Sequence, residues 1–157
     1  MRHQDSSAAC PSAEGLRVGV VTAVFHERIT SGLKAGAVEF LREAGAAEIH
    51  TVDAPGAFEV PLLAQRLATS GYDAVVCLGA VIEGETDHYE HVAHRASEGL
   101  MRVQLDTGIP IAFGILTVRS VESAVARSQP GKDNKGREAA IAAVSTANTL
   151  RGLTKDD

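Results

Sequence analysis

Short runs of apolar residues alternate along this chain with stretches in which an apolar residue returns at every third or fourth position. A continuous apolar, β-branched run indicates a buried strand, and the spaced pattern indicates a helix with one face in the core. Strands are predicted at residues 16–25, 47–52, 73–82 and 109–118. Helices are predicted after them at residues 29–41, 60–67, 88–105, 121–127 and 135–150.

This order of elements predicts the fold class. Strands that are joined by helices must run parallel, because a helical crossover returns the chain to the same end of the sheet. We therefore expect an α/β protein, a three-layer α/β/α sandwich around a four-stranded parallel sheet, with a flavodoxin-like arrangement. The 157 residues are enough for one domain. Residues 16–157 are expected to form it, and residues 1–15 a mobile polar tail.

The predicted sheet also indicates where a ligand would bind. In an open parallel sheet, ligands lie beyond the carboxyl ends of the strands. The residues at those ends occupy positions 25–26, 53–59, 81–88 and 117–118. They include several aromatic, acidic and histidine side chains, so we expect the functional site at this edge.

Charge and composition exclude several classes of function. The formal net charge of −5 argues against a surface for nucleic acid or an anionic membrane. No apolar run has membrane-spanning length, and the first fifteen residues lack the apolar core of a signal peptide. Cys10 and Cys77 form no CxxC pair, so neither a disulfide nor a zinc site is expected. Cys77 lies in an apolar run, which fits a buried thiol in a reducing cytoplasm.

The segment Gly79–His88 carries the strongest chemical signal. A buried strand is predicted to end near Gly84 and to lead into a helix that starts two or three residues later. Backbone N–H groups at such a start attract anions, so the amides of Glu85 and Thr86 are candidates for binding one phosphate. His88 would lie in the first helical turn, where an imidazole can transfer protons near neutral pH. Taken alone, a solvated histidine at a helix start is the alternative.

The start of this helix allows two further interpretations. If Asp87 is the N-cap residue, Glu90 stands three positions later and the two form a capping box. Histidines 88, 91 and 94 suggest a metal site, but their spacing sweeps round the helix and no HExxH pattern accompanies them. A polar helix face is the better interpretation, and no metal is expected.

Motifs for larger nucleotides are missing. The glycine spacing at residues 79–84 is that of a P-loop, but the lysine that a P-loop places on its phosphates is absent. The GxGxxG pattern is absent as well. Nucleoside triphosphates and dinucleotides are therefore poor candidates, whereas a single phosphate fits.

Further candidates lie near the other strand ends. Arg127 and Lys135 flank a polar loop, where a guanidinium could bind a phosphate through two hydrogen bonds or could be an exposed ion-pairing group. Phe25 and Phe58 could cover a planar ring or pack in the core. Glu59 could accept hydrogen bonds from a polyol or from ring N–H groups, or could be an acid favoured by the helix dipole.

Together, four segments resemble motifs of one family, the lumazine synthases. They are Asp53–Pro61 (DAPGAFEVP), Gly79–Glu90 (GAVIEGETDHYE), Ala112–Thr117 (AFGILT) and Asn134–Ala140 (NKGREAA). The segments occur in the family's order and near its spacing, and the similarity extends from about Val18 to Leu150. A match of four ordered motifs is specific.

The resemblance implies a transferase of riboflavin biosynthesis that uses no cofactor and no metal. Such enzymes condense 5-amino-6-ribitylaminouracil with 3,4-dihydroxy-2-butanone 4-phosphate to 6,7-dimethyl-8-ribityllumazine and release phosphate. The family's steps are imine formation, phosphate elimination, ring closure and dehydration. The resemblance also implies a homo-oligomer built on pentamers, with active sites between subunits and with no nucleic-acid or membrane partner.

The matched motifs imply roles for particular residues. His88 corresponds to the family's proton-transfer residue. Arg127, the amides of Glu85 and Thr86, and Lys135 correspond to its phosphate site. The residues that correspond to its pyrimidine and ribityl site are Phe25, Ala57, Phe58, Glu59, Ala80, Val81, Ile82 and Phe113. Within that set, Phe25 would stack on the pyrimidine, and Phe113 would come from a neighbouring subunit.

Some positions depart from the family's pattern. His26 stands where many members have asparagine, Glu83 where many have arginine, and Ala126 where an acid is frequent. The loop at residues 128–133 differs too. Three alternatives stay open: a flavin- or lumazine-binding homologue with little catalysis, a mainly structural shell protein, and a generic phosphate binder of this fold. The sequence does not decide between pentamer, decamer and sixty-subunit capsid.

Overall fold

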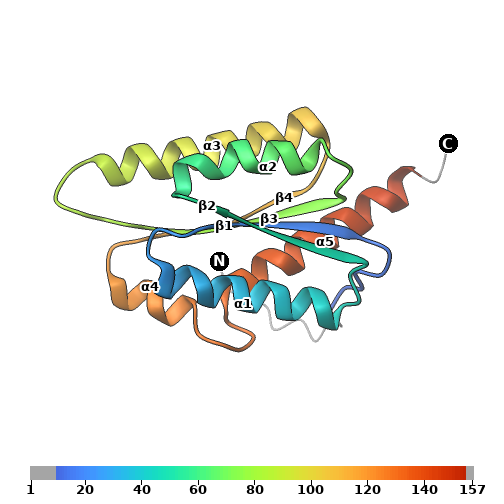
Figure 1. The fold of residues 1–157 in the computed structure, drawn as a ribbon, viewed down its shortest axis with the longest axis horizontal. Helices are drawn as coiled ribbons and strands as arrows, with labels where there is room; N and C mark the ends of the chain where they lie inside the picture. Colours follow the sequence, from blue (N-terminus) through green and yellow to red (C-terminus); the bar gives the residue numbers. More distant parts are fainter. Residues whose placement is uncertain (1–9, 155–157) are drawn as a thin grey trace.

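A four-stranded parallel sheet forms the centre of the molecule in the computed structural model, which describes residues 10–154 (Figure 1). The strands are β1 (Arg17–Ala23), β2 (Glu48–Ala54), β3 (Ala74–Ile82) and β4 (Ile111–Val118). They lie in the order β2-β1-β3-β4, and each neighbouring pair is parallel. The predicted fold class is confirmed. Residues 1–9 and 155–157, and with them most of the predicted tail, lie outside the described residues.

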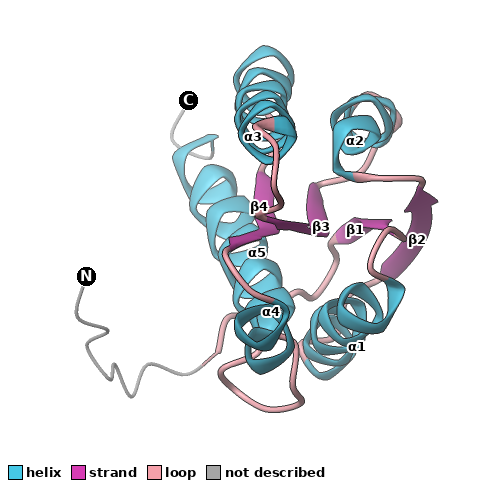
Figure 2. Ribbon diagram, turned by 90° about the vertical axis from the view of Figure 1, so that its left-hand side faces the viewer, coloured by secondary structure: helices cyan, strands magenta, loops and turns pink. Residues whose placement is uncertain are grey.

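Helices cover both faces of the sheet and complete three layers (Figure 2). One face carries α2 (Val60–Ala68), which follows a short 3-10 turn, η1 (Ala57–Glu59), and α3 (His88–Thr107). The other face carries α1 (Glu27–Glu43), α4 (Val121–Arg127) and α5 (Lys135–Thr154). An apolar cluster fills the space on each side of the sheet. Strands β1 and β3 contribute side chains to both clusters, because their apolar runs are continuous rather than alternating.

Local signals set several helix boundaries. Pro61 lies in the first turn of α2, where its missing N–H leaves no helical hydrogen bond unmade. Ser120 is the N-cap residue of α4, and its hydroxyl accepts the N–H of Ser123 at 3.2 Å. Gly45 follows α1 at φ 83°, a left-handed conformation that glycine adopts without strain.

The predicted capping box at the start of α3 is wrong. Asp87 is the N-cap residue, but its side chain makes no capping hydrogen bond. Its backbone lies at φ −75° and ψ 3°, away from the extended conformation from which a capping side chain reaches the helix. The Asp87 carboxylate lies 3.4 Å from Nε2 of His91, and the His88 N–H donates to the Thr86 hydroxyl at 3.4 Å.

The packed part of the chain begins before residue 16, where the sequence predicted the tail to end. Ala13 is fully buried, and its N–H donates to the carbonyl of Ala44 at 2.9 Å. Glu14 forms an isolated antiparallel bridge with Ala46. So short a segment has no hydrophobic period, and the sequence pattern therefore gave no sign that it packs.

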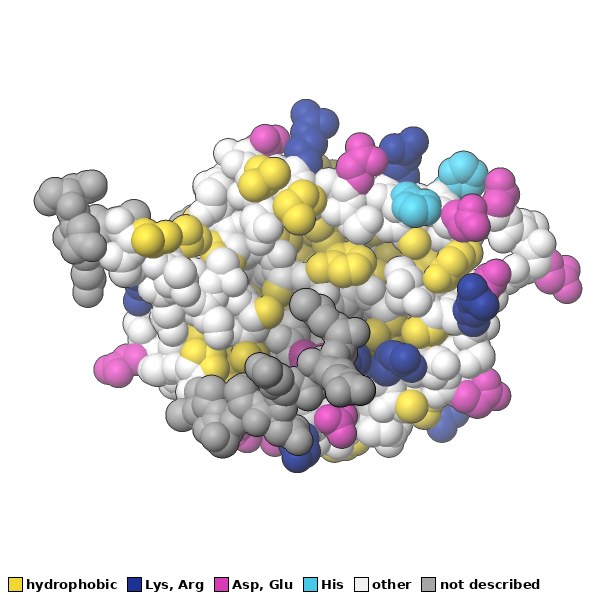
Figure 3. Space-filling model, turned by 180° about the vertical axis from the view of Figure 1, so that it is seen from behind, with side chains coloured by type: hydrophobic (Ala, Val, Ile, Leu, Met, Phe, Trp, Pro, Cys, Tyr) yellow, Lys and Arg dark blue, Asp and Glu magenta, His cyan; other side chains and the backbone are white. Residues whose placement is uncertain are grey.

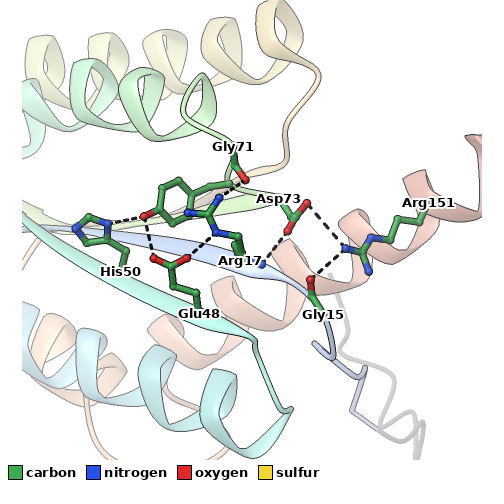
Figure 4. A network of polar contacts seen from close by, with 8 residues as sticks. Gly15, Arg17, Glu48, His50, Gly71, Asp73 and Arg151 are labelled. Atoms are coloured by element: carbon green, nitrogen blue, oxygen red, sulfur yellow. Dashed lines mark hydrogen bonds and ion pairs between the residues drawn. The ribbon is translucent and has the colours of Figure 1, made fainter.

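Polar side chains connect the amino ends of the strands, at the end of the sheet opposite the predicted site (Figure 4). Nε of Arg17 donates a 2.6 Å hydrogen bond to the carboxylate of Glu48, and the N–H of Arg17 donates to Asp73 at 2.8 Å. The Tyr72 hydroxyl donates to Glu48 at 3.3 Å and lies 2.6 Å from Nδ1 of His50. The hydrogen bond from Arg17 lowers the pKa of Glu48 below its ordinary value, and the same bond raises the pKa of Arg17.

This pKa shift predicts a pH-dependent contribution to stability. Because the folded protein binds the Glu48 proton less tightly, the contribution is present above the unfolded-state pKa of about 4.3 and is lost as the pH falls through the folded value. We expect Glu48→Gln to lower the midpoint of thermal unfolding at pH 7 and to have little effect near pH 3. Glu39→Gln is the control, since the Glu39 carboxylate has no ion pair within the described residues. An equal loss at both pH values would contradict the prediction.

Candidate active site

The strand order creates a place for a ligand. From β1 the chain moves to β2 at one edge of the sheet, whereas β3 lies on the other side of β1 and is followed by β4. The connections therefore turn in opposite directions beyond the carboxyl ends of β1 and β3, where open α/β sheets bind ligands. Phe25 follows β1, and residues 83–88 follow β3, so both segments border this switch point.

A hollow of about 170 Å³ lies at the switch point. Its wall is mainly apolar and includes the end of β3, at residues 80–82, together with Ala57 and Val92. The Phe25 ring borders the same hollow and is 65% exposed, so a face of this aromatic ring is accessible to a planar ligand. Four side chains supply polar atoms: His26, Thr86, His88 and Tyr89.

A second hollow of about 550 Å³ continues the first. Both hollows are lined by Phe25, Ala57, His88 and Val92, so they form one recess. The second hollow adds the turn before α2, with Phe58 and the Glu59 carboxylate, and it adds His91 from α3. An imidazole, an aromatic ring and a carboxylate thus border a space large enough for a small polar ligand.

A third hollow of about 370 Å³ lies over β4 and contains the predicted phosphate-binding cations. Arg127 and Lys135 line it together with Phe113, which is 48% exposed. The guanidinium donates to the carbonyl of Ser123 at 3.0 Å within α4, and the Lys135 ammonium lies 2.9 Å from the Glu138 carboxylate. This Arg127 hollow shares no lining residue with the recess.

Asn134 fixes the loop that separates Arg127 from Lys135. Its side chain is 2% exposed, and its Oδ1 accepts the N–H of Arg137 at the start of α5. Its Nδ2 donates to the carbonyl oxygens of Gly32, Ser128 and Gln129 at 3.0, 3.1 and 3.0 Å. One amide therefore holds α1, the loop and α5 together, and a methyl group at Gly36 would collide with it.

Loss of this amide is expected to destabilise the protein. In an Asn134→Ala variant, buried carbonyl oxygens lose their donor, and we expect a loss of about 2–3 kcal/mol in the free energy of unfolding. Chemical denaturation at one protein concentration measures it. Asn148→Ala in α5 is the control, because Asn148 is only half-buried and its side chain makes one hydrogen bond, to the carbonyl of Ser12 at 2.9 Å. Equal losses in the two variants would contradict the prediction.

The loop before α3 offers donors to an anion. The N–H groups of Glu85 and Thr86 donate no hydrogen bond to any other described residue. Thr86 lines the first hollow, whereas Glu85 lines none of the three. Within residues 10–154, no three potential metal ligands are grouped closely enough for a metal ion.

The structure divides the predicted site residues into two groups. The recess is lined by Phe25, Ala57, Phe58, Glu59, Ala80, Val81, Ile82, Thr86 and His88. The Arg127 hollow is lined by Phe113, Arg127 and Lys135. A single chain therefore does not bring His88 and Arg127 to a common cavity.

Three polar residues of the recess were not among the predicted site residues: His26, Tyr89 and His91. His91 was predicted to lie on a polar helix face. His26 was noted at the end of the first predicted strand and as a departure from a motif, but it was given no role in the site. Its position directly after an aromatic residue at a strand end was the signal that could have placed it in the site.

An open parallel sheet with a recess at its switch point defines a protein of the doubly wound α/β class that binds a small molecule. The family model of 6,7-dimethyl-8-ribityllumazine synthase matches residues 15–151, and the chain belongs to this family. The resemblance found in the four motifs is confirmed. Family membership assigns the chain to riboflavin biosynthesis and implies small-molecule substrates and oligomerisation.

Proposed function

We propose that this chain is a transferase that condenses 5-amino-6-ribitylaminouracil with 3,4-dihydroxy-2-butanone 4-phosphate to give 6,7-dimethyl-8-ribityllumazine and inorganic phosphate. The chain belongs to the family, and the observation that carries the proposal is its recess. His88, Phe25 and Glu59 border this recess at the switch point of the sheet. These groups match the three parts of the first substrate: an amine that must exchange protons, a planar ring and a polyol.

The reaction needs proton transfer more than activation of the reactants. The amino group of one substrate attacks the ketone of the other and water leaves to form an imine. Loss of a proton and of phosphate follows, and ring closure with loss of a second water gives the product. His88 is proposed to carry these protons, because its imidazole lines both parts of the recess. Holding the reactants together supplies much of the remaining rate effect.

Other residues are proposed to position the substrates. The exposed Phe25 ring stacks on the pyrimidine, the residues at 80–82 line the ring pocket, and Ala57, Phe58 and Glu59 hold the ribityl chain.

Arg127 and Lys135, together with the amides of Glu85 and Thr86, bind the phosphate. A fixed guanidinium also stabilises the charge that develops as phosphate departs. No cofactor or metal is needed for these steps.

We further propose that each active site forms between two subunits of a homo-oligomer built on pentamers. The recess and the Arg127 hollow are separate on one chain, which supports the proposal that a neighbour's Arg127 hollow completes the recess. Edge strand β4 carries the half-exposed Phe113, and Met101 and Leu105 of α3 are also exposed. Seen from behind, hydrophobic side chains gather across the middle of the molecule (Figure 3). Burial of such side chains against a second copy would stabilise the oligomer.

Mixed oligomers test the shared site. His88→Ala and Arg127→Ala subunits are unfolded together, refolded at equal ratio, and assayed at low butanone phosphate. If the two residues come from neighbouring subunits, about one quarter of the sites regain both side chains, and activity exceeds the mean of the two variants. Activity equal to that mean would contradict the arrangement. Wild-type subunits mixed with each variant serve as controls.

The proposed reaction itself is tested by the appearance of product. Full-length protein is incubated with both substrates, and formation of the lumazine is followed by absorbance, with either substrate omitted as the control. The alternative is a lumazine- or flavin-binding homologue, for which His26 and Glu83 are the motivating residues. Glu83 replaces an arginine of the motif and faces Arg119 at 3.7 Å. Ligand binding without turnover would favour that alternative.

A cytoplasmic location is part of the proposal. The thiol of Cys77 is fully buried, and burial raises its pKa, so it is an inert core group rather than a disulfide partner. Within the described residues, no helix combines the length and the apolar character that crossing a lipid bilayer requires.

A further inference from the structure

We propose that His26 is a substrate-positioning residue, whose imidazole forms a hydrogen bond with the edge of the pyrimidine ring that lies on Phe25. This inference rests on the proposed function, because it assigns a role toward the pyrimidine substrate. None of the residue roles carried over from the family motifs includes position 26, where this chain departs from the motif.

The backbone of His26 has an uncommon conformation. It lies at φ 63° and ψ 50°, and it is the only residue other than glycine with positive φ among residues 10–154. Such a conformation is costly for most side chains, although asparagine, aspartate and histidine tolerate it best. The carbonyl of His26 accepts the N–H groups of Ile29 and Thr30 and so begins α1. The backbone is thereby fixed, and it aims the side chain independently of the helix.

His26 borders the recess, and its imidazole has unused polar atoms. The residue is half-buried and lines the first hollow. Its imidazole does not cap α1, and its ring nitrogens make no hydrogen bond to any other described residue. A neutral imidazole carries one donor and one acceptor. Both are therefore free to bind a ligand in the hollow.

The geometry favours contact with a ring edge. The centroids of the His26 and Phe25 rings are 4.5 Å apart, and the ring planes are inclined by 65°. A planar ligand parallel to Phe25 is inclined to the imidazole by the same angle, so the two cannot stack face to face. The edge of a pyrimidinedione carries the carbonyl and N–H groups that an imidazole pairs with.

The other polar residues that line the first hollow come from a different part of the fold than His26. Thr86, His88 and Tyr89 all come from the start of α3 or the loop before it. On the side formed by β1 and α1, the polar side chain in the lining is His26. Without it, the pyrimidine edge on that side would lose its water and gain no partner, which weakens binding.

Two substitutions at position 26 distinguish the contribution of the imidazole from that of the backbone conformation. His26→Gly adopts positive φ without strain and removes the ring, whereas His26→Asn tolerates the conformation and keeps a donor and an acceptor. Steady-state kinetics on the full-length chain give kcat and KM for each substrate. Calorimetry with 5-amino-6-ribitylaminouracil alone gives its dissociation constant. His94→Asn is the control, because His94 lies on α3 and lines neither part of the recess.

We expect His26→Gly to raise the KM and the dissociation constant for the pyrimidine substrate about three- to tenfold, the loss of one hydrogen bond. The KM for butanone phosphate should stay within about twofold, and His26→Asn should restore most of the affinity. Unchanged pyrimidine affinity in a folded His26→Gly protein, or equal rises for both substrates, would overturn the inference. Absence of product from the wild-type protein would overturn the proposed reaction instead, and calorimetry would still test the role of His26.

Discussion

Replacement of Arg127 by alanine is expected to raise the KM for 3,4-dihydroxy-2-butanone 4-phosphate by about ten- to hundredfold, the cost of losing a charged hydrogen-bond partner. Arg127 lines the hollow over β4, and its guanidinium is held by the Ser123 carbonyl of the same helix. Its loss leaves the phosphate with Lys135 and backbone amides. The KM for the pyrimidine substrate should change little, because Phe25 and Glu59 lie in the recess.

Two further variants sharpen this result. Arg127→Lys keeps the charge but loses the paired donors, and its KM should fall between those of the wild type and the alanine variant. Arg95→Ala is the matched control, because Arg95 pairs with Glu98 at 3.0 Å on α3 and lines none of the three hollows. Initial rates at varied butanone phosphate measure the effect. A wild-type KM in Arg127→Ala would remove this residue from the phosphate site.

Replacement of His88 by alanine is expected to slow kcat by about tenfold or more without abolishing turnover. The imidazole borders both parts of the recess, so it can reach several proton-transfer steps. The substrates stay positioned by the remaining lining, and positioning alone sustains part of the rate. Water then carries the protons more slowly.

The measurement is kcat at saturating concentrations of both substrates. His94→Ala in the same helix is the control and should retain the wild-type kcat, because His94 lines neither part of the recess. A kcat equal to that of the wild type would contradict the assignment of His88.

The elements that the sequence predicted are those with strong local signals. The uninterrupted apolar run of β3 is typical of a strand that is buried on both faces of a parallel sheet. Pro61 and Ser120 act within one helical turn, so their neighbours alone decide their roles. The capping box failed although Asp87 and Glu90 satisfy the motif, because the Asp87 backbone lies at φ −75° and ψ 3° and its side chain makes no capping hydrogen bond.

The parts that the sequence did not predict depend on contacts between distant segments. Asn134 lies 102 residues from Gly32, and no local pattern indicates that its amide joins them. The resemblance implied that Phe113 comes from a neighbouring subunit but not that Arg127 and Lys135 accompany it, whereas the structure places all three in one hollow away from the recess. The role of His26 depends on a backbone conformation that composition and spacing do not report.

The ion-paired network at the amino ends of the strands and the recess at their carboxyl ends occupy opposite ends of the same sheet. Arg17 and Glu48 line neither part of the recess that His88 and Phe25 border, and effects at well-separated positions usually add. Thermal tolerance and substrate preference are therefore adjustable independently in this scaffold. An engineer can strengthen one end first and then reshape the other, with each change measurable against an unaltered background.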